Sequence, residues 1–188
     1  IFLQNGRVIA DCSISEAVNA YLNSLEKANI RDISTRTDRQ GRGKVRLTKV
    51  EILGSGNIVS NTLATGQPAC FKFNVSSLVR GMSCLFDIFD HLGNPVAKFQ
   101  TDYVGDEDEF CEENGLTFTC EIDELLLMPG RYRINVLIRG DGEWQDFIEG
   151  ASIFDVEEGT IRGRPIPAHK VNRANVSLPH RWKSPALS

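Results

Sequence analysis

The chain is poor in the residues that hydrolases and zinc proteins place at their centres. Only three His and five Cys occur among its 188 residues, and no two Cys form a CxxC pair. His91 falls in a predicted turn, and His169 and His180 lie near the C-terminus. None of them forms a helix-spaced metal pair or accompanies a recognisable nucleophile motif. We therefore expect neither catalytic residues nor a metal site in this chain.

Long apolar runs are also missing. No segment approaches the roughly 20 apolar residues that a membrane-spanning helix needs, and no signal peptide opens the chain. The run Gly41-Arg42-Gly43-Lys44 lacks the upstream Gly and the following Ser or Thr of a phosphate loop. We therefore expect no nucleotide cofactor in this chain.

Cysteine usage indicates the compartment. Cys70, Cys84 and Cys120 fall within apolar strand patterns, which favours buried free thiols over disulfides or metal ligands. Free thiols are typical of a reducing, cytosolic setting. We therefore expect a cytoplasmic protein.

The net charge of −4 is unevenly distributed. Residues 161–188 contain six Lys or Arg and no Asp or Glu, so the rest of the chain carries −10. A second basic stretch runs from Arg31 to Lys49. Basic stretches can bind nucleic acid or an anionic membrane, but aromatics are not interleaved with these charges. We favour solvated segments and expect no nucleic-acid partner.

The first 22 residues predict a small unit that cannot stand alone. Asn5-Gly6 between two apolar runs predicts a hairpin, and Ser13 with Glu16 forms a capping box that opens a helix. Two short strands and one helix cannot bury a core of their own. Since the chain also lacks an initiating Met, we expect it to begin inside a larger protein.

From Lys44 onward the sequence predicts strands. Apolar residues alternate with polar ones in segments such as 69–75, 82–88, 116–122 and 132–138, between turns rich in Gly, Pro and Asn. Val45 and Leu47 are out of phase with Val50 and Ile52, which indicates a β-bulge. Seven or eight short strands predict an all-β fold, an immunoglobulin-like antiparallel β-sandwich preceded by a short hairpin-helix stub.

The outward side of this sandwich is the candidate binding site. Period two turns one set of side chains away from the core, and that set mixes apolar with planar polar and charged residues. Such a mixture suits a sugar, whose ring stacks on apolar groups while its hydroxyls form hydrogen bonds. Coverage of the face by the linker, the tail or a second subunit is the alternative. The candidate residues are Leu85, Asp87, Phe89, Lys98, Gln100, Arg131, Arg133, Asn135 and Leu137.

Three further features allow two interpretations each. The acidic run 105–115 could bind calcium, but it lacks the ligand spacing of an EF-hand, so a solvated loop is favoured. Trp144 could be an exposed binding aromatic or a loop anchor. The segment from Val176 to Trp182, after a Pro-rich basic stretch, could be a docking or swapped arm or a disordered terminus.

Several motifs together resemble one protein family. Gly6-Arg7-Val8, Asp11 and Val18-Asn19-Ala20-Tyr21-Leu22 resemble the C-terminal end of ABC transporter ATPases, although Cys12 stands where Gly is usual. The strand region resembles the C-terminal domain of Wzt-type proteins, the ATPase subunits of ABC exporters of bacterial O-antigen polysaccharide. The matching features there are Gly41/Gly43 before Val45 and Leu47, Gly54, Gly66 before Phe71-Lys72-Phe73, Ile88-Phe89-Asp90 with Gly93 and Val96, Pro129-Gly130 with Tyr132, and Leu178 to Trp182.

This resemblance implies a function and a set of partners. It implies a β-sandwich that binds the end-modified O-antigen polysaccharide at the inner face of the inner membrane and thereby sets export specificity. It also implies a homodimer with an exchanged C-terminal strand, and contact with the membrane-spanning subunit through an ATPase domain that would hold ATP and Mg. A purely structural dimerisation domain is the alternative.

The expected domain organisation follows from these patterns. It comprises the ATPase stub 1–22, a linker 23–42, the carbohydrate-binding sandwich 43–160 and the C-terminal arm 161–188.

Overall fold

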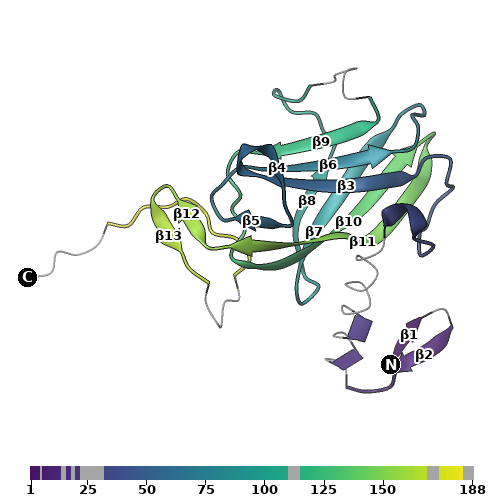
Figure 1. Ribbon diagram of the computed structural model, residues 1–188, viewed down its shortest axis with the longest axis horizontal. Helices are drawn as coiled ribbons and strands as arrows, with labels where there is room; N and C mark the ends of the chain where they lie inside the picture. Colours follow the sequence, from purple (N-terminus) through teal and green to yellow (C-terminus); the bar gives the residue numbers. More distant parts are fainter. Residues whose placement is uncertain are drawn as a thin grey trace, which may run out of the picture.

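The main body of the protein is a sandwich of two β-sheets (Figure 1). The computed structural model describes residues 1–4, 6–13, 16–17, 20–21, 32–109, 115–168 and 174–183. Within them, the first sheet has the strand order β5-β11-β10-β7-β8, with β5 (Thr62–Ala64), β11 (Glu143–Glu157), β10 (Gly130–Gly140), β7 (Ser83–Asp90) and β8 (Pro95–Gln100). The second has the order β4-β3-β6-β9, with β4 (Ile58–Val59), β3 (Leu47–Gly54), β6 (Ala69–Val75) and β9 (Thr117–Ile122). The predicted all-β sandwich is confirmed.

Strand pairing follows the predicted antiparallel scheme with one exception. The short strand β5 runs parallel to the end of β11, where Thr62 pairs with Asp155. The predicted bulge in β3 is present, since its register against β6 shifts between Leu47 and Lys49. The extra residue lets Leu47 and Ile52 both reach the core despite their odd spacing.

Aromatic side chains from both sheets form the core between them. Phe71 and Phe73 of β6 contact Phe86 of β7 at ring-centroid distances of 5.4 and 4.8 Å, and Phe71 also contacts Phe154 of β11 at 5.7 Å. Phe86 stacks on Phe99 of β8 at 4.5 Å. Burial of such large apolar side chains is the main driving force for packing the two sheets.

Tyr132 forms a corner typical of immunoglobulin-like sandwiches. Its ring is buried beside Phe154, and its hydroxyl donates to the Met128 carbonyl at 2.7 Å, four residues upstream. Burial raises the pKa of Tyr132 to about 12. The Pro129-Gly130-x-Tyr132 motif therefore has a structural role at the start of β10.

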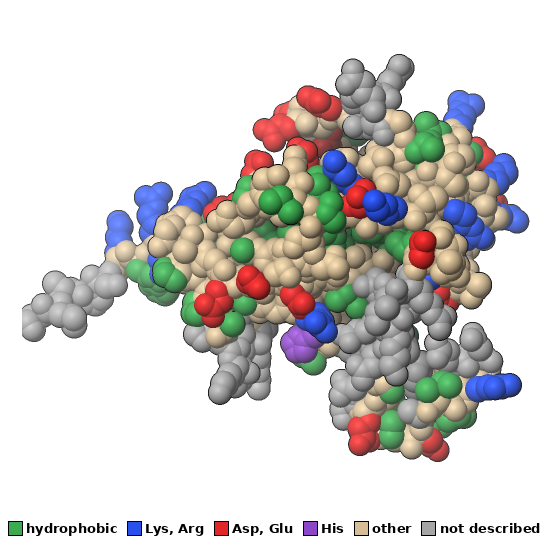
Figure 2. All heavy atoms as spheres, in the orientation of Figure 1, with side chains coloured by type: hydrophobic (Ala, Val, Ile, Leu, Met, Phe, Trp, Pro, Cys, Tyr) green, Lys and Arg blue, Asp and Glu red, His purple; other side chains and the backbone are tan. Residues whose placement is uncertain are grey.

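The surface charges are segregated. Lys and Arg side chains gather at the end of the sandwich where β3 begins, at the right of Figure 2, and Asp and Glu side chains gather on the loop beside β9, at the top. Residues 105–109 of that acidic loop are exposed, and Asp108 accepts a hydrogen bond from the Gly105 amide. Among residues that the structure describes, no group of three His, Cys, Asp or Glu could hold a metal ion.

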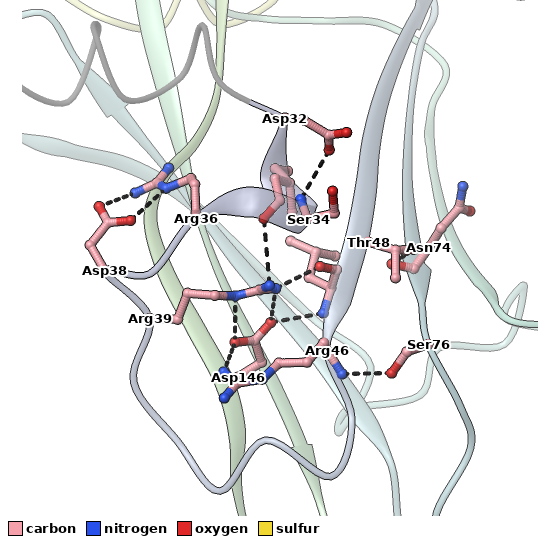
Figure 3. Close-up of polar contacts among 12 residues, drawn as sticks. Asp32, Ser34, Arg36, Asp38, Arg39, Arg46, Thr48, Asn74, Ser76 and Asp146 are labelled. Atoms are coloured by element: carbon pink, nitrogen blue, oxygen red, sulfur yellow. Dashed lines mark hydrogen bonds and ion pairs between the residues drawn. The ribbon is translucent and has the colours of Figure 1, made fainter.

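The basic segment before β3 differs from the solvated linker expected there. The side chain of Arg39 is buried beside Asp146 of β11, whose carboxylate also accepts from Arg46 at 2.9 Å and from the Leu47 amide at 2.7 Å (Figure 3). The fully buried Asp146 carboxylate thus compensates two guanidinium groups. Because these charges are paired inside the protein, residues 32–46 belong to the sandwich, and the expected linker is wrong over residues 32–42. Residues 22–31 lie outside the described ranges.

The same segment continues alongside β11. Gln40 forms a β-bridge with Phe147, and the Gly43 amide donates to the Gln145 carbonyl at 2.9 Å. Gly41 has φ +119°, and a Cβ atom there would lie 2.6 Å from the Gln145 carbonyl. This close approach excludes a residue with a side chain and explains the glycine at position 41.

The stub has the predicted local structure. Strands β1 (Phe2–Gln4) and β2 (Arg7–Ala10) form a hairpin in which Gln4 pairs with Arg7. Ser13 and Glu16 form the capping box: the Ser13 amide donates to the Glu16 carboxylate at 3.1 Å, and the Glu16 amide donates to the Ser13 hydroxyl at 3.4 Å. Val18 and Leu22 of the ATPase-like motif lie outside the described residues.

The C-terminal region adds a hairpin and a returning segment. Strands β12 (Gly159–Ile161) and β13 (Arg164–Ile166) form this hairpin, and β12 packs against the turn at Gly66, where a Cβ atom would lie 1.9 Å from the Thr160 carbonyl. Asn175 and Ser177 then pair with residues 126–128, and Asn175 also donates to Asp90 at 3.1 Å. The expected arm therefore docks on its own sandwich in this structure. Exchange between two copies stays a prediction.

The cysteines are consistent with the expected thiols. Cys70 and Cys84 are buried, Cys120 is partly buried and Cys12 is exposed, and all four are free. Burial raises the pKa of the Cys120 thiol to about 11. Cys111 lies outside the described residues.

Candidate functional site

The outer face is the side of the five-stranded sheet that is turned away from the core. Strand pairing sets its rows: Leu85 lies opposite Leu137, Asp87 opposite Asn135, and Phe89 opposite Arg133. On the other side of β7, Asp87 faces Lys98 and Leu85 faces Gln100. Arg131 shares this face because it is two residues from Arg133. The register therefore brings all nine candidate residues to one face.

Three of these nine side chains are closed off. Leu85 is 4% exposed, Asn135 8% and Leu137 9%. The Asn135 oxygen accepts a hydrogen bond from the Gly150 amide at 2.8 Å. These residues support the sheet, and in this conformation they offer little surface to a ligand.

A three-residue bulge in β11 explains the role of Asn135. Val136 pairs with Ile148 and Ile134 with Ser152, so three residues of β11 stand opposite Asn135 alone. The bulge removes residues 149–151 from the ladder. The buried Arg36 binds the carbonyls of Glu149 and Gly150, both at 2.7 Å, while Asn135 binds the Gly150 amide. Both side chains therefore satisfy backbone groups that the bulge leaves unpaired.

Arg133 and Phe89 form the most distinctive contact on the outer face. The guanidinium carbon of Arg133 lies 4.7 Å from the centroid of the Phe89 ring, a cation–π contact. Its Nε and Nη1 atoms are buried and make no hydrogen bond with any part of the chain that the structure describes. Both side chains are partly exposed. Together they form a partly exposed planar stack, and two buried N–H groups of its guanidinium lack acceptors among the described residues.

The remaining candidates surround this pair. Asp87 is partly exposed and Lys98 is exposed. Arg131 forms an exposed ion pair with Asp155 at 2.9 Å, which contributes little stability because water screens it. Gln100 also lines a pocket of about 840 Å³ between β8 and β9. Polar groups of both signs are thus available around the Arg133–Phe89 stack.

The nine residues predicted from the sequence include none from β11, although β11 also contributes to this face. Phe147 pairs with Leu137, Ile153 with Arg133 and Asp155 with Arg131. Phe147, Ile153 and Asp155 are separated by even numbers of residues, and the bulge inserts two extra residues, so a two-residue period still places all three on one face. Trp144 is 49% exposed, and its ring lies 5.8 Å from that of Phe147. The signal that could have found these residues is the same two-residue period, counted along β11 and across the bulge at Gly150.

One residue of the stub also touches this face. The Tyr21 hydroxyl donates a short hydrogen bond to the carboxylate of Glu149, within the bulge. Burial raises the pKa of Tyr21, the bond to Glu149 raises it further, and the nearby Arg133 lowers it. At this point of the outer face, next to the Arg133–Phe89 stack, a residue of the stub therefore covers part of the surface, as the alternative interpretation expected.

In the part of the chain that the structure describes, no helix has the length and hydropathy to cross a membrane.

Comparisons with known proteins agree with this architecture. The family model of the Wzt C-terminal domain matches residues 36–165. Among solved structures, the crystal structure of the C-terminal domain of Wzt is similar with a TM-score of 0.52 and 14% sequence identity, over 74% of this chain and 90% of that chain. The comparison with curated proteins gave no match. The family match begins at Arg36, the residue that holds the β11 bulge, and on this match the chain belongs to the Wzt C-terminal domain family.

Proposed function

We propose that this domain binds a polysaccharide on its outer face and so determines which glycan an ABC exporter carries. The observation that supports this best is the Arg133–Phe89 stack, with two guanidinium nitrogens that make no hydrogen bond among the described residues. Planar stacking surfaces bind the apolar side of a pyranose, and N–H donors bind its hydroxyl or acidic groups. Asp87, Lys98 and Gln100 add polar groups within two strands of the stack.

The proposed glycan is the end-modified O-antigen polysaccharide, as the resemblance to Wzt-type exporters implies. In this proposal the chain is the non-catalytic end of an ATPase subunit, and ATP and Mg bind in a preceding domain. The subunit forms a homodimer that joins the membrane-spanning subunit at the cytoplasmic side of the inner membrane. Family membership supports the transporter context.

Calorimetric titration tests the glycan proposal. The 188-residue chain is titrated with O-polysaccharide that carries its terminal modification and with the same polymer without it. The proposal predicts saturable binding of the modified polymer and at least roughly tenfold weaker binding of the unmodified one, since about 1.4 kcal/mol is the scale of one lost polar contact. Equal absence of binding to both polymers would refute it.

A structural dimerisation domain is the second candidate, and the C-terminal arm favours it. Leu178 and Trp182 are 67% and 75% exposed, although both are large apolar side chains. Exposed apolar residues on a docked arm suit a contact with a second copy. If the arm joins two copies, truncation after Ala168 converts a dimer into a monomer in sedimentation measurements. A dimer that survives truncation would exclude this role for the arm.

A further inference from the structure

Tyr21 is bound to the bulge of β11, far from its own segment in the sequence. Its hydroxyl donates to the Glu149 carboxylate, although 128 residues separate the two in the chain. The backbone of Glu149 is held in place because its carbonyl oxygen accepts a hydrogen bond from the buried Arg36 at 2.7 Å. The end of the described stub is thus anchored to one defined point of the sandwich.

That anchor point adjoins Arg133. Glu149 lies in the bulge opposite Asn135, which is two residues from Arg133. The pKa of Tyr21 is raised first by burial and then by Glu149, and it is lowered by the positive charge of Arg133. Tyr21, Glu149 and Arg133 therefore form one cluster. Arg133 enters it with Nε and Nη1 buried and without hydrogen-bond partners among the described residues, which is an unfavourable state for a guanidinium.

We propose that docking of Tyr21 on Glu149 and binding of a glycan to Arg133 exclude each other, so that glycan binding releases the stub from the sandwich. This inference rests on the proposed function. In this proposal a glycan group bound at Arg133 competes with Tyr21 for the space beside Glu149. Glycan binding and stub docking then oppose each other by the same factor, because coupling between two binding events is reciprocal. The stub is then docked when the outer face is empty and released when a glycan is bound there.

The test uses Tyr21→Phe in the 188-residue chain, with Tyr103→Phe as the matched control. Tyr21→Phe removes the hydroxyl that binds Glu149 and keeps the ring. Tyr103 is 78% exposed, follows the end of β8 and is not one of the nine candidate residues, so the same change there is expected to leave both measurements close to the wild type. Hydrogen–deuterium exchange of residues 16–21 measures stub docking, and calorimetry measures affinity for the modified O-polysaccharide.

Three results are expected. Without glycan, Tyr21→Phe exchanges faster at residues 16–21 than the wild type. Saturating glycan accelerates exchange there in the wild type. The variant binds the glycan roughly three- to tenfold more tightly, since less docking has to be displaced.

Two outcomes overturn the inference in distinguishable ways. If glycan binds the wild type but leaves exchange at residues 16–21 unchanged, or if Tyr21→Phe binds with wild-type affinity, the exclusion is wrong and the glycan-binding function stands. If no variant binds glycan, both proposals are wrong, whatever the exchange of the stub shows.

Discussion

The two sheets present similar inner faces and very different outer faces. The outer side of the four-stranded sheet carries Lys72, Asn74, Thr119 and Glu121, in rows fixed by the pairing of β6 with β9. The outer side of the five-stranded sheet carries the partly exposed Phe89 and Phe147 between its charged residues. A solvated sheet face is expected to be polar throughout. The core explains the inner sides of both sheets, and the partly exposed aromatic side chains of the second outer face are the ones that the proposed ligand would cover.

The comparison also separates two kinds of polar residue on the outer face. Asn135 satisfies a backbone amide, and the β11 bulge requires it. Arg133 satisfies no backbone group through its Nε and Nη1 atoms within the described chain. A polar residue with a structural partner supports the face, whereas one without a partner is the better candidate for a ligand contact.

The largest expected effect comes from Arg133. We expect Arg133→Ala to weaken glycan binding by roughly 30- to 100-fold, about 2–3 kcal/mol, because hydrogen bonds from a charged donor are among the stronger ones. Lys72→Ala on the opposite outer face is the control and leaves the affinity within about twofold. Calorimetry on both variants decides the matter: equal effects would remove the distinction between the two faces.

Substitution of Asn135 tests the difference between the two outer faces through the stability of the protein. Asn135→Ala leaves the Gly150 amide without its acceptor, so we expect the free energy of unfolding to fall by about 1–3 kcal/mol. Asn74→Ala on the other face removes a bond to the partly exposed Thr117 hydroxyl, and the expected loss is under about 1 kcal/mol. Urea denaturation measures both. A larger loss for Asn74→Ala contradicts the assigned role of the bulge.

Phe89 tests the stacking surface. Phe89→Ala removes the ring under the Arg133 guanidinium, and we expect roughly tenfold weaker glycan binding, about 1.4 kcal/mol. Thr119→Ala on β9 is the matched control. Thermal melting of both variants shows that they remain folded. Wild-type affinity in folded Phe89→Ala would exclude the stack as a sugar platform.

The smallest effect is expected from the ion pair between Lys49 and Glu51 on the solvated face. The hydrogen bond from Lys49 lowers the pKa of Glu51, so the pair stabilises the protein above the unfolded pKa of Glu51 and loses this contribution as pH falls through the folded pKa. Because the pair is exposed, Lys49→Ala should change the free energy of unfolding by less than about 0.5 kcal/mol at pH 7, and by less still at a pH below the folded pKa of Glu51. Urea titrations at the two pH values measure this difference. An effect well above that limit at pH 7 means that the face is not simply solvated.

Local patterns predicted most of the fold. Alternation of apolar residues gave the strands that bear the core, and the phase change after Leu47 gave the β3 bulge. The hairpin and capping box of the stub also followed from short-range chemistry. These features could be predicted because neighbouring residues determine them.

Long-range contacts could not be predicted in the same way. The partner of Arg39 is Asp146, 107 residues away, and no local pattern distinguishes that pair from solvated charges. For the same reason the sequence showed which residues share the outer face but not that Leu85, Asn135 and Leu137 are closed off. The two-residue period predicts which side of the sheet a side chain points to. Its burial depends on which distant segments pack over it, and the period does not show these.

The most direct test of the account is to map where the glycan binds. Hydrogen–deuterium exchange of the 188-residue chain is measured with and without saturating end-modified O-polysaccharide. We predict slower exchange in β7, β8 and β10 and no change in β3, β6 and β9. Protection confined to the four-stranded sheet, while the glycan is bound, would contradict the assignment of the outer face as the binding site.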